Sequence, residues 1–380
     1  MDKYLTDAKW FIENLPYRSS PYNGRNWGHP WHSLCSYHGK LKPAIAHFLI
    51  STFTNKNDVI LDPLCGVGTI PFEACLQGRT GIGNDMSEMA YIVSKAKLEK
   101  PSLNEVQTIL SQLEIYVNEN VHEMMNSSEA LPYNNFGFNG KLPEYFERQT
   151  YCEILVGRKY FLGRFNSLSS AEAMVFSAFL HVLHGNRPYA LSRTSHPLTP
   201  YAPKGEFQYK SVVKHITNKI QLSYKKGDFN TYVLGRSILG DYSNLSSLLS
   251  SVDSIICSPP FADSIRFYMM NWMRLWLCGW ETVDFKKADV KFIDKKQKKD
   301  FGVYSSFFEM CFNVLKPNGK VILHLGKTDK YDMAKELSIQ AIPFFDEVYR
   351  GSENVSEIEK HGIRDKGSTT DHQFLFLRKK

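Results

Sequence analysis

Short apolar runs and helical patterns alternate at both ends of the chain. Residues 58–62 (DVILD) and 253–257 (DSIIC) are mostly apolar, which predicts buried strands. Residues 43–54 and 87–99 instead place apolar side chains at helical spacing. Strands that alternate with helices in this way predict an open α/β sheet.

More strands are predicted in the second half of the chain. Residues 235–241 form one, and residues 320–325 form another after the turn at 317–319 (PNG). Residues 346–349 and 373–377 suit a terminal antiparallel pair. The expected sheet therefore has about seven strands and ends in an antiparallel hairpin.

Residues 101–230 interrupt the alternation, and we predict a mainly helical insertion there. Its clearest helix begins at Ser169, which forms a capping-box pattern with Glu172, and ends before Gly185. Residues 1–40 show little periodicity and predict an ordered arm without regular structure. The chain thus divides into residues 1–100, 101–230 and 231–380.

A glycine turn follows the first predicted strand. Asp62 ends that strand, Gly66 and Gly68 allow the backbone to approach a ligand closely, and a helix begins near Thr69. Strand, glycine turn and helix form the nucleotide-cradling arrangement of α/β sheets. Asp85 follows about twenty residues later, where its carboxylate suits both hydroxyls of a ribose.

A second turn, Ser258-Pro259-Pro260-Phe261, follows the strand at 253–257. The two prolines stiffen the turn and remove two backbone donors. The Ser258 side chain and the Pro259 carbonyl can then both accept hydrogen bonds from one polar group of a substrate. Phe261 offers a flat face for stacking on a base. The alternative interpretation is a proline-stiffened strand end with a core aromatic.

These two stretches carry a family resemblance. Residues 62–69 resemble the S-adenosylmethionine motif of amino-methyltransferases, and residues 258–261 resemble their catalytic motif in the version that begins with Ser. That version is typical of DNA methyltransferases that modify the N4 amine of cytosine. The resemblance implies a Rossmann-like methyltransferase sheet and a flipped-out target base. It covers residues 1–100 and 231–380, the two halves of the catalytic domain. The long insertion at 101–230 departs from the family pattern, which leaves target recognition either to this insertion, as a possible DNA-recognition region, or to a separate subunit.

The resemblance also implies the site residues. In the family, the segment before the cofactor strand lines the methionine end of the cofactor, and we place Tyr37 and Lys40 there. An acid after the third strand reaches the adenine amine, which indicates Asp241. The predicted catalytic residues are Ser258, Pro259, Pro260 and Phe261. The predicted cofactor-binding residues are Tyr37, Asp62, Pro63, Cys65, Gly66, Gly68, Thr69, Asp85, Met86, Asp241 and Ser258.

Several other activities remain open. Adenine-N6 methyltransferases more often begin the catalytic motif with Asp or Asn. RNA guanine-N2 methyltransferases share the cofactor core at residues 65–70 (CGVGTI). They also carry Asn or Asp before the prolines, and often an N-terminal RNA-binding module for which the first forty residues are too short. Cytosine-C5 methylation needs a nucleophilic cysteine after proline, and no Pro-Cys pair occurs. A non-catalytic DNA-binding relative is disfavoured by the intact cofactor motif.

Charge and aromatic content point mildly to a polyanionic partner. The net charge is +7, and residues 185–226 interleave cations with aromatic rings, which suits phosphate contacts and base stacking. The candidate DNA-binding residues are Arg187, Arg193, Lys204 and Lys210. The alternative is a solvated helical face with a proline-rich loop. Residues 284–300 alternate Lys and Asp and predict a solvated loop or a DNA-backbone contact.

Composition narrows the setting of the protein. Seven scattered cysteines form no Cys-x-x-Cys pair, so neither a metal site nor a disulfide framework is predicted. No apolar run is long enough to span a bilayer and no signal peptide is recognisable, so we expect a cytoplasmic protein. The expected partners are double-stranded DNA and a cognate restriction or defence-system subunit.

Overall fold

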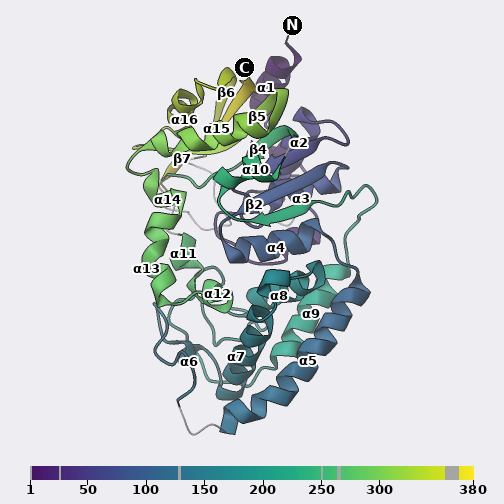
Figure 1. The fold of residues 1–380 in the computed structure, drawn as a ribbon, viewed down its shortest axis with the longest axis vertical. Coiled ribbons are helices and arrows are strands. Elements are labelled where there is room, and N and C mark those ends of the chain that lie inside the picture. The colour runs from purple at the N-terminus through teal and green to yellow at the C-terminus, as the bar shows by residue number, and fades with distance from the viewer. Residues whose placement is uncertain (1, 25–26, 127–129, 250, 263–266, 356–367) are drawn as a thin grey trace.

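The computed structural model describes residues 2–24, 27–126, 130–249, 251–262, 267–355 and 368–380. Within these residues seven strands form one sheet in the order β3-β2-β1-β4-β5-β7-β6 (Figure 1). The strands are β1 (Val59–Asp62), β2 (Thr80–Asp85), β3 (Arg236–Leu239), β4 (Val252–Cys257), β5 (Leu315–Thr328), β6 (Phe345–Asn354) and β7 (Thr369–Lys379).

The pairing matches the predicted sheet. Strands β1 to β5 pair in parallel, and β7 lies antiparallel between β5 and β6. The predicted Rossmann-like methyltransferase fold with a terminal antiparallel hairpin is therefore confirmed. The chain order reverses between β1 and β4, and the carboxyl ends of strands at such a switch point are where open α/β sheets bind ligands.

Alternate strand residues bury against helices on the two faces of the sheet. Ile60 of β1 packs on one face with α1 (Lys3–Asn14), α2 (Pro43–Phe53) and α3 (Thr69–Leu76). Leu61 packs on the other face, in the core formed with α10 (Leu245–Leu248), α15 (Ser305–Val314) and α16 (Met333–Ala341). The period of two along a strand sends neighbouring side chains to opposite cores. Helix α4 (Glu88–Leu98) contacts β2 and β3.

The first helix corrects the expectation for residues 1–40. Helix α1 begins after Asp2, whose side chain accepts a hydrogen bond from the Tyr4 backbone, and it buries Tyr4, Ala8 and Phe11. Spacings of four and three residues put these side chains on one helix face. That face packs on the sheet, where the Phe11 ring lies 5.2 Å from Phe374. The pattern is short and surrounded by polar residues, so the composition of the arm obscured it.

The insertion between β2 and β3 is helical in the residues that are described. Its helices are α5 (Leu103–Asn126), α6 (Leu142–Tyr145), α7 (Arg148–Leu162), α8 (Ser170–Val182) and α9 (Val212–Tyr224). Ser169 and Glu172 form the predicted capping box at the start of α8. Helix α8 packs against α4, so the insertion lies below the sheet in Figure 1.

The connection between β4 and β5 also differs from its prediction. After residue 266 this connection contains α11 (Phe267–Met270) and α12 (Trp272–Leu277). The predicted solvated loop at 284–300 instead contains most of α13 (Thr282–Lys291) and all of α14 (Ile293–Lys296). Among the residues described, no helix is both long and apolar enough to cross a membrane.

Candidate active site

The glycine turn lies between the end of β1 and the start of α3. Gly66 and Gly68 adopt left-handed conformations, with φ of 50° and 71°, which side chains disfavour. A Cβ atom on Gly68 would lie only 2.9 Å from the Cβ atom of Ser94, so α4 fits closely behind the turn. Pro63 and Cys65 are buried within the turn, and Thr69 is buried in the first turn of α3. These predicted residues thus form one continuous structure.

Asp85 braces this turn from the end of β2. Its Oδ2 accepts a hydrogen bond from the Gly66 backbone at 2.9 Å, and its Oδ1 accepts one from the Ser87 backbone at 2.9 Å. Burial raises the pKa of Asp85 to about 6. Met86 lies half-buried beside it. The carboxylate is therefore ionised above about pH 6 and fixed in orientation.

Asn84, which sequence reasoning missed, ties three strand ends together. Its side-chain amide donates to the Pro63 carbonyl at 3.0 Å and to the Gly240 carbonyl at 3.2 Å. The segment after β3 is thereby held beside the glycine turn. Asp241, the next residue, is half-buried and accepts a hydrogen bond from the Ser243 backbone at 2.9 Å. A polar side chain among the small residues of β2 was the available signal for Asn84.

Tyr37 covers the glycine turn from the N-terminal arm. A Cβ atom on Gly66 would lie 3.3 Å from both the ring edge and the hydroxyl oxygen of Tyr37. The Tyr37 ring packs against Phe267 of α11 at 5.2 Å. Tyr37 therefore lies at the turn, whereas the Lys40 ammonium donates to the His32 carbonyl at 2.6 Å. That Tyr37 lines the methionine end of a cofactor stays a prediction.

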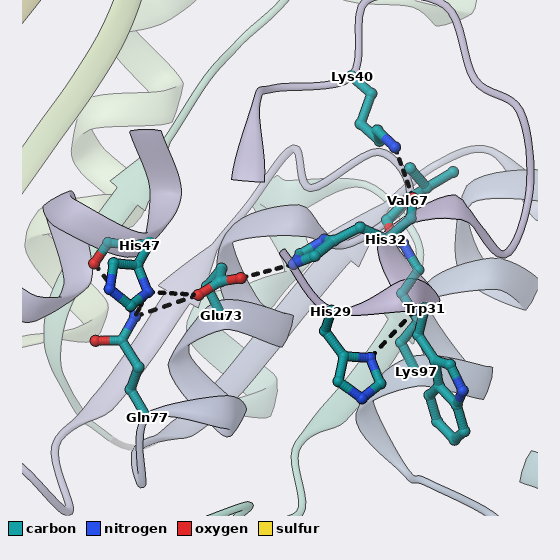
Figure 2. A network of polar contacts seen from close by, with 9 residues as sticks. All are labelled: His29, Trp31, His32, Lys40, His47, Val67, Glu73, Gln77 and Lys97. Atoms are coloured by element: carbon teal, nitrogen blue, oxygen red, sulfur yellow. Dashed lines mark hydrogen bonds and ion pairs between the residues drawn. The ribbon is translucent and has the colours of Figure 1, made fainter. Parts of the chain in front are cut away.

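A buried polar network fixes the arm to α3 (Figure 2). Glu73 of α3 has its Oε1 2.7 Å from Nε2 of His32 and its Oε2 3.2 Å from Nδ1 of His47. Burial opposes the charge, but the two imidazoles hold the pKa of Glu73 at about 2. His32 belongs to the N-terminal arm and His47 to α2. The ionised Glu73 carboxylate therefore joins the arm and α2 to α3.

Lys97 supports the glycine turn from behind. Its side chain is fully buried, and its Nζ donates to the Val67 carbonyl at 2.7 Å (Figure 2). Burial, together with the Lys40 ammonium, lowers the pKa of Lys97 well below its usual range. The turn is therefore held by Lys97, Asp85 and Tyr37 from three directions.

The Ser-Pro-Pro-Phe turn starts at the neighbouring strand end. Leu61 of β1 pairs with Ile255 of β4, so both turns leave the sheet at the same edge. Asp62 lies buried between them, and burial raises its pKa to about 7 despite a hydrogen bond with Cys257. Ser258 is half-buried at the end of β4, and Pro259 is buried behind it.

Two unpredicted residues shape this second turn. Gln297, next to α14, donates to the Pro260 carbonyl at 2.9 Å. Gly326 of β5 makes room for the Phe261 ring, since a Cβ atom there would lie 2.4 Å from it. One side of the Phe261 ring is thus packed on the sheet, and part of the half-buried ring remains exposed.

The residues at the first turn fit S-adenosylmethionine. Each carboxylate oxygen has two acceptor positions, and each Asp85 oxygen uses one of them on a backbone N–H. Asp85 therefore retains acceptor capacity for ribose hydroxyls, and Asp241 retains it for an adenine amine. The left-handed glycines leave room for a close ligand. The site would thus be formed by Gly66, Asp85, Asp241 and Tyr37.

The four candidate DNA-binding residues fall into two groups. Arg187 and Lys204 are exposed on the insertion. Arg193 instead donates to the carbonyls of Gly205 at 2.6 Å and Glu144 at 3.0 Å. The Lys210 ammonium donates to two carbonyls of its own chain, including that of Ser192 at 2.9 Å. Arg193 and Lys210 therefore hold the insertion together, and the prediction of phosphate contacts applies best to the exposed pair.

Sequence comparisons match parts of this chain to methyltransferases. Residues 30–130 match the family model described as UPF0020, RMKL-like, methyltransferase domain. Over 79 residues the chain is 29% identical to the Type II methyltransferase M.MjaII of Methanocaldococcus jannaschii. That match covers 21% of this chain and only 15% of the relative.

Solved structures with some similarity are also methyltransferases by name. TrmN from Thermus thermophilus is 13% identical with a TM-score of 0.36, covering 92% of this chain and 52% of its own. The rRNA methyltransferase aviRa from Streptomyces viridochromogenes is 10% identical with a TM-score of 0.34, covering 91% and 88%. The chain thus spans about half the length of TrmN. These similarities are weak, so the fold assignment rests on the strand order itself.

The strand order gives the chain a Rossmann-like methyltransferase fold, and the family match over residues 30–130 agrees with it. The cofactor of this class of enzymes is S-adenosylmethionine.

Proposed function

We propose that the protein methylates the exocyclic N4 amine of cytosine in DNA, on a base flipped out of the duplex. One observation carries the proposal. The Ser258 turn and the glycine turn leave neighbouring strands at the same edge of the sheet, so an acceptor base and the cofactor would meet there. The proposed partners are double-stranded DNA and a cognate restriction or defence-system subunit.

The chain's own residues would prepare the amine for reaction. The lone pair of an exocyclic amine is delocalised into the ring, which makes the nitrogen a poor nucleophile. Hydrogen bonds from the amine to Ser258 and to the Pro259 carbonyl favour a more tetrahedral nitrogen, and Phe261 stacks on the flipped base. S-adenosylmethionine, when bound, supplies an electrophilic methyl group. Holding both reactants at one sheet edge supplies much of the rate by orientation.

The leading Ser258 favours cytosine N4, and the match to a Type II methyltransferase supports DNA as the substrate. Adenine N6 is the first alternative, because related amine methylases use the same chemistry. RNA guanine N2 is the second, since the cofactor core at 65–70 is shared with RNA methyltransferases.

Labelled S-adenosylmethionine tests the proposal directly. The protein is incubated with genomic DNA, and in parallel with total RNA, and the nucleosides are identified by mass spectrometry. We expect the parent protein to form N4-methylcytosine in DNA. Ser258→Ala and Phe261→Ala should form only a trace of this product, and the exposed control Ser111→Ala should keep full activity. Finding N6-methyladenine in DNA or N2-methylguanine in RNA would show that the target base is adenine or guanine and not cytosine. The absence of product on both polymers would contradict the proposed activity.

A further inference from the structure

A buried histidine contacts the first residue of the Ser-Pro-Pro-Phe turn. His324 of β5 follows Leu323, the residue that pairs with Cys257 of β4, so its side chain is next to Ser258 across the sheet. The Ser258 Oγ and the His324 Nδ1 lie 3.0 Å apart, which is hydrogen-bond distance. His324 is only 4% exposed. His324 is the polar residue in the apolar stretch 321–325 (VILHL) of β5, and it has no role in the chemistry proposed above.

The surroundings of His324 decide which nitrogen carries the proton. Burial and the neighbouring His372 lower the pKa of His324 well below its usual range, so the ring is neutral. Aromatic rings surround it, with ring centroids of His372 at 4.9 Å, Phe374 at 5.1 Å and Phe261 at 5.6 Å. The faces of aromatic rings are electron-rich, so they attract an N–H group and repel a nitrogen lone pair.

The protonation of the second ring nitrogen, Nε2, follows from this environment. The Nε2 atom of His324 is buried and makes no hydrogen bond with any residue that the structure describes. No hydrogen-bond donor among the described residues reaches Nε2, so a lone pair there would stay unpaired. A proton on Nε2 can instead be partly satisfied by the π systems of the aromatic rings packed around His324. The favoured tautomer therefore has Nε2 protonated, and Nδ1 accepts the hydrogen bond from the Ser258 hydroxyl.

This direction of the hydrogen bond limits what Ser258 can offer to a substrate. A serine hydroxyl has one hydrogen and two lone pairs. Once the hydrogen points at His324, only the lone pairs face the site, so Ser258 can accept but cannot donate. An exocyclic amine donates to such a group, whereas the keto oxygen of uracil, thymine or guanine would meet it lone pair to lone pair.

We infer that His324 is a specificity-determining positioning residue, which fixes Ser258 as a hydrogen-bond acceptor so that the site admits an exocyclic amine and rejects a keto oxygen. The inference deepens the proposed function and rests on it for the identity of the substrate. The hydrogen-bond direction itself rests on the Ser258–His324 contact and on the surroundings of Nε2, and it does not depend on the identity of the substrate.

Nitrogen NMR tests the direction of the hydrogen bond without any substrate. The full chain is labelled with ¹⁵N at histidine, and the His324 signals are assigned by their loss in His324→Asn. The ¹⁵N shifts separate a protonated from an unprotonated ring nitrogen. We expect a protonated Nε2 and an unprotonated Nδ1 at neutral pH. A protonated Nδ1 would overturn the inference, because His324 would then donate to Ser258.

Binding selectivity tests the consequence. Two duplexes carry cytosine or uracil at the position mapped as methylated, each opposite an abasic site so that base pairing does not differ. Affinity is measured by fluorescence anisotropy with S-adenosylhomocysteine present. The parent should prefer cytosine by about tenfold, which corresponds to ~1.4 kcal/mol.

Two variants separate the hydrogen bond from packing. His324→Phe keeps an aromatic ring but removes the acceptor, and it should bind both duplexes within about twofold of one another. His324→Asn can present an amide oxygen to Ser258 and should retain the preference. Thermal unfolding identifies any variant that fails to fold. If one variant does not fold, the NMR result and the binding data for the other variant decide whether Ser258 donates to His324. An undiminished cytosine preference in folded His324→Phe would overturn the inference. Failure of the proposed function would appear differently, as no methylated base on any polymer while the tautomer stays as expected.

Discussion

Replacing Gln297 should most clearly separate the proposed reaction centre, which is the Ser258 turn, from the proposed cofactor site. The Gln297 side chain is fully buried, donates to the Pro260 carbonyl at 2.9 Å and accepts from the Tyr304 hydroxyl at 2.8 Å. Gln297→Leu has a similar size and removes both hydrogen bonds. We expect lower stability, lower turnover and unchanged cofactor affinity.

The magnitude follows from the two groups that lose their partner. A buried polar group left unpaired costs about 1–3 kcal/mol. Tyr304 is fully buried, so its hydroxyl should cost the upper part of that range, whereas Pro260 is half-buried and water can reach part of it. The free energy of unfolding should therefore fall by about 2–4 kcal/mol. Loosening the turn that carries the Pro259 carbonyl should reduce kcat by about tenfold or more.

Urea unfolding measures the loss of stability. A methyl-transfer assay measures kcat, and isothermal titration calorimetry measures the affinity for S-adenosylmethionine. Gln107→Leu, at an exposed position on α5, is the matched control and should change stability by less than about 0.5 kcal/mol. A Gln297→Leu protein that unfolds like the control and keeps its full kcat would refute the reasoning.

Gln297→Glu adds a test with a defined pH dependence. A carboxylate here would face the Pro260 carbonyl lone pair to lone pair, while a protonated carboxyl group would donate to it. Burial raises the pKa of such a group above its ordinary value of about 4.3. The variant should therefore approach the parent in stability at low pH and lose stability as the pH rises through the raised pKa. A constant difference from the parent across this range would contradict the contact.

Three further results are expected. Burial raises the pKa of Asp62 from 3.8 to about 7, so its charged form opposes folding, and Asp62→Asn should gain stability over the parent as the pH rises from about 4 to above 7 in urea unfolding. Asp85→Ala should weaken S-adenosylmethionine binding in calorimetry by about tenfold without unfolding the protein, through loss of a charge-assisted hydrogen bond. Replacing Arg187 and Lys204 with Ala should reduce the slope of log affinity for DNA against log salt concentration by about 2. Lys210→Ala should lower the stability of the protein instead. Equal salt slopes for the parent and the double variant would exclude Arg187 and Lys204 from phosphate contact.

The fold and the two turns could be predicted because their signals are contiguous in the sequence. Gly66 and Gly68 lie in one stretch with Asp62, and Ser258 begins an unbroken tetrapeptide. Local chemistry determines such turns, since glycine and proline restrict or free the backbone at their own positions. The capping box at Ser169 succeeded for the same reason.

The residues that support these turns could not be predicted in the same way. Gln297 lies among lysines and aspartates that look like a solvated run, and only the packing of α14 against the β4 turn buries it. His324 reaches Ser258 because β5 pairs with β4, a contact across 66 residues of sequence. A pattern within one segment carries no information about which distant segment will cover it. Weak signals did exist, since Gln297 is an uncharged side chain among charged ones and His324 is a polar side chain among apolar ones.

The two turns are supported in the same way, by side chains from other segments of the chain. The glycine turn is fixed by Lys97 and Tyr37, and the Ser258 turn is fixed by His324 and Gln297, so each is held by side chains from separate segments. The connection that carries Gln297 is therefore part of the scaffold of the reaction centre as well as a source of surface charge. The buried Gln297 amide of this connection must stay in register with Pro260. Changes to the lysines of the same connection should accordingly alter affinity for nucleic acid, and changes to Gln297 should alter turnover.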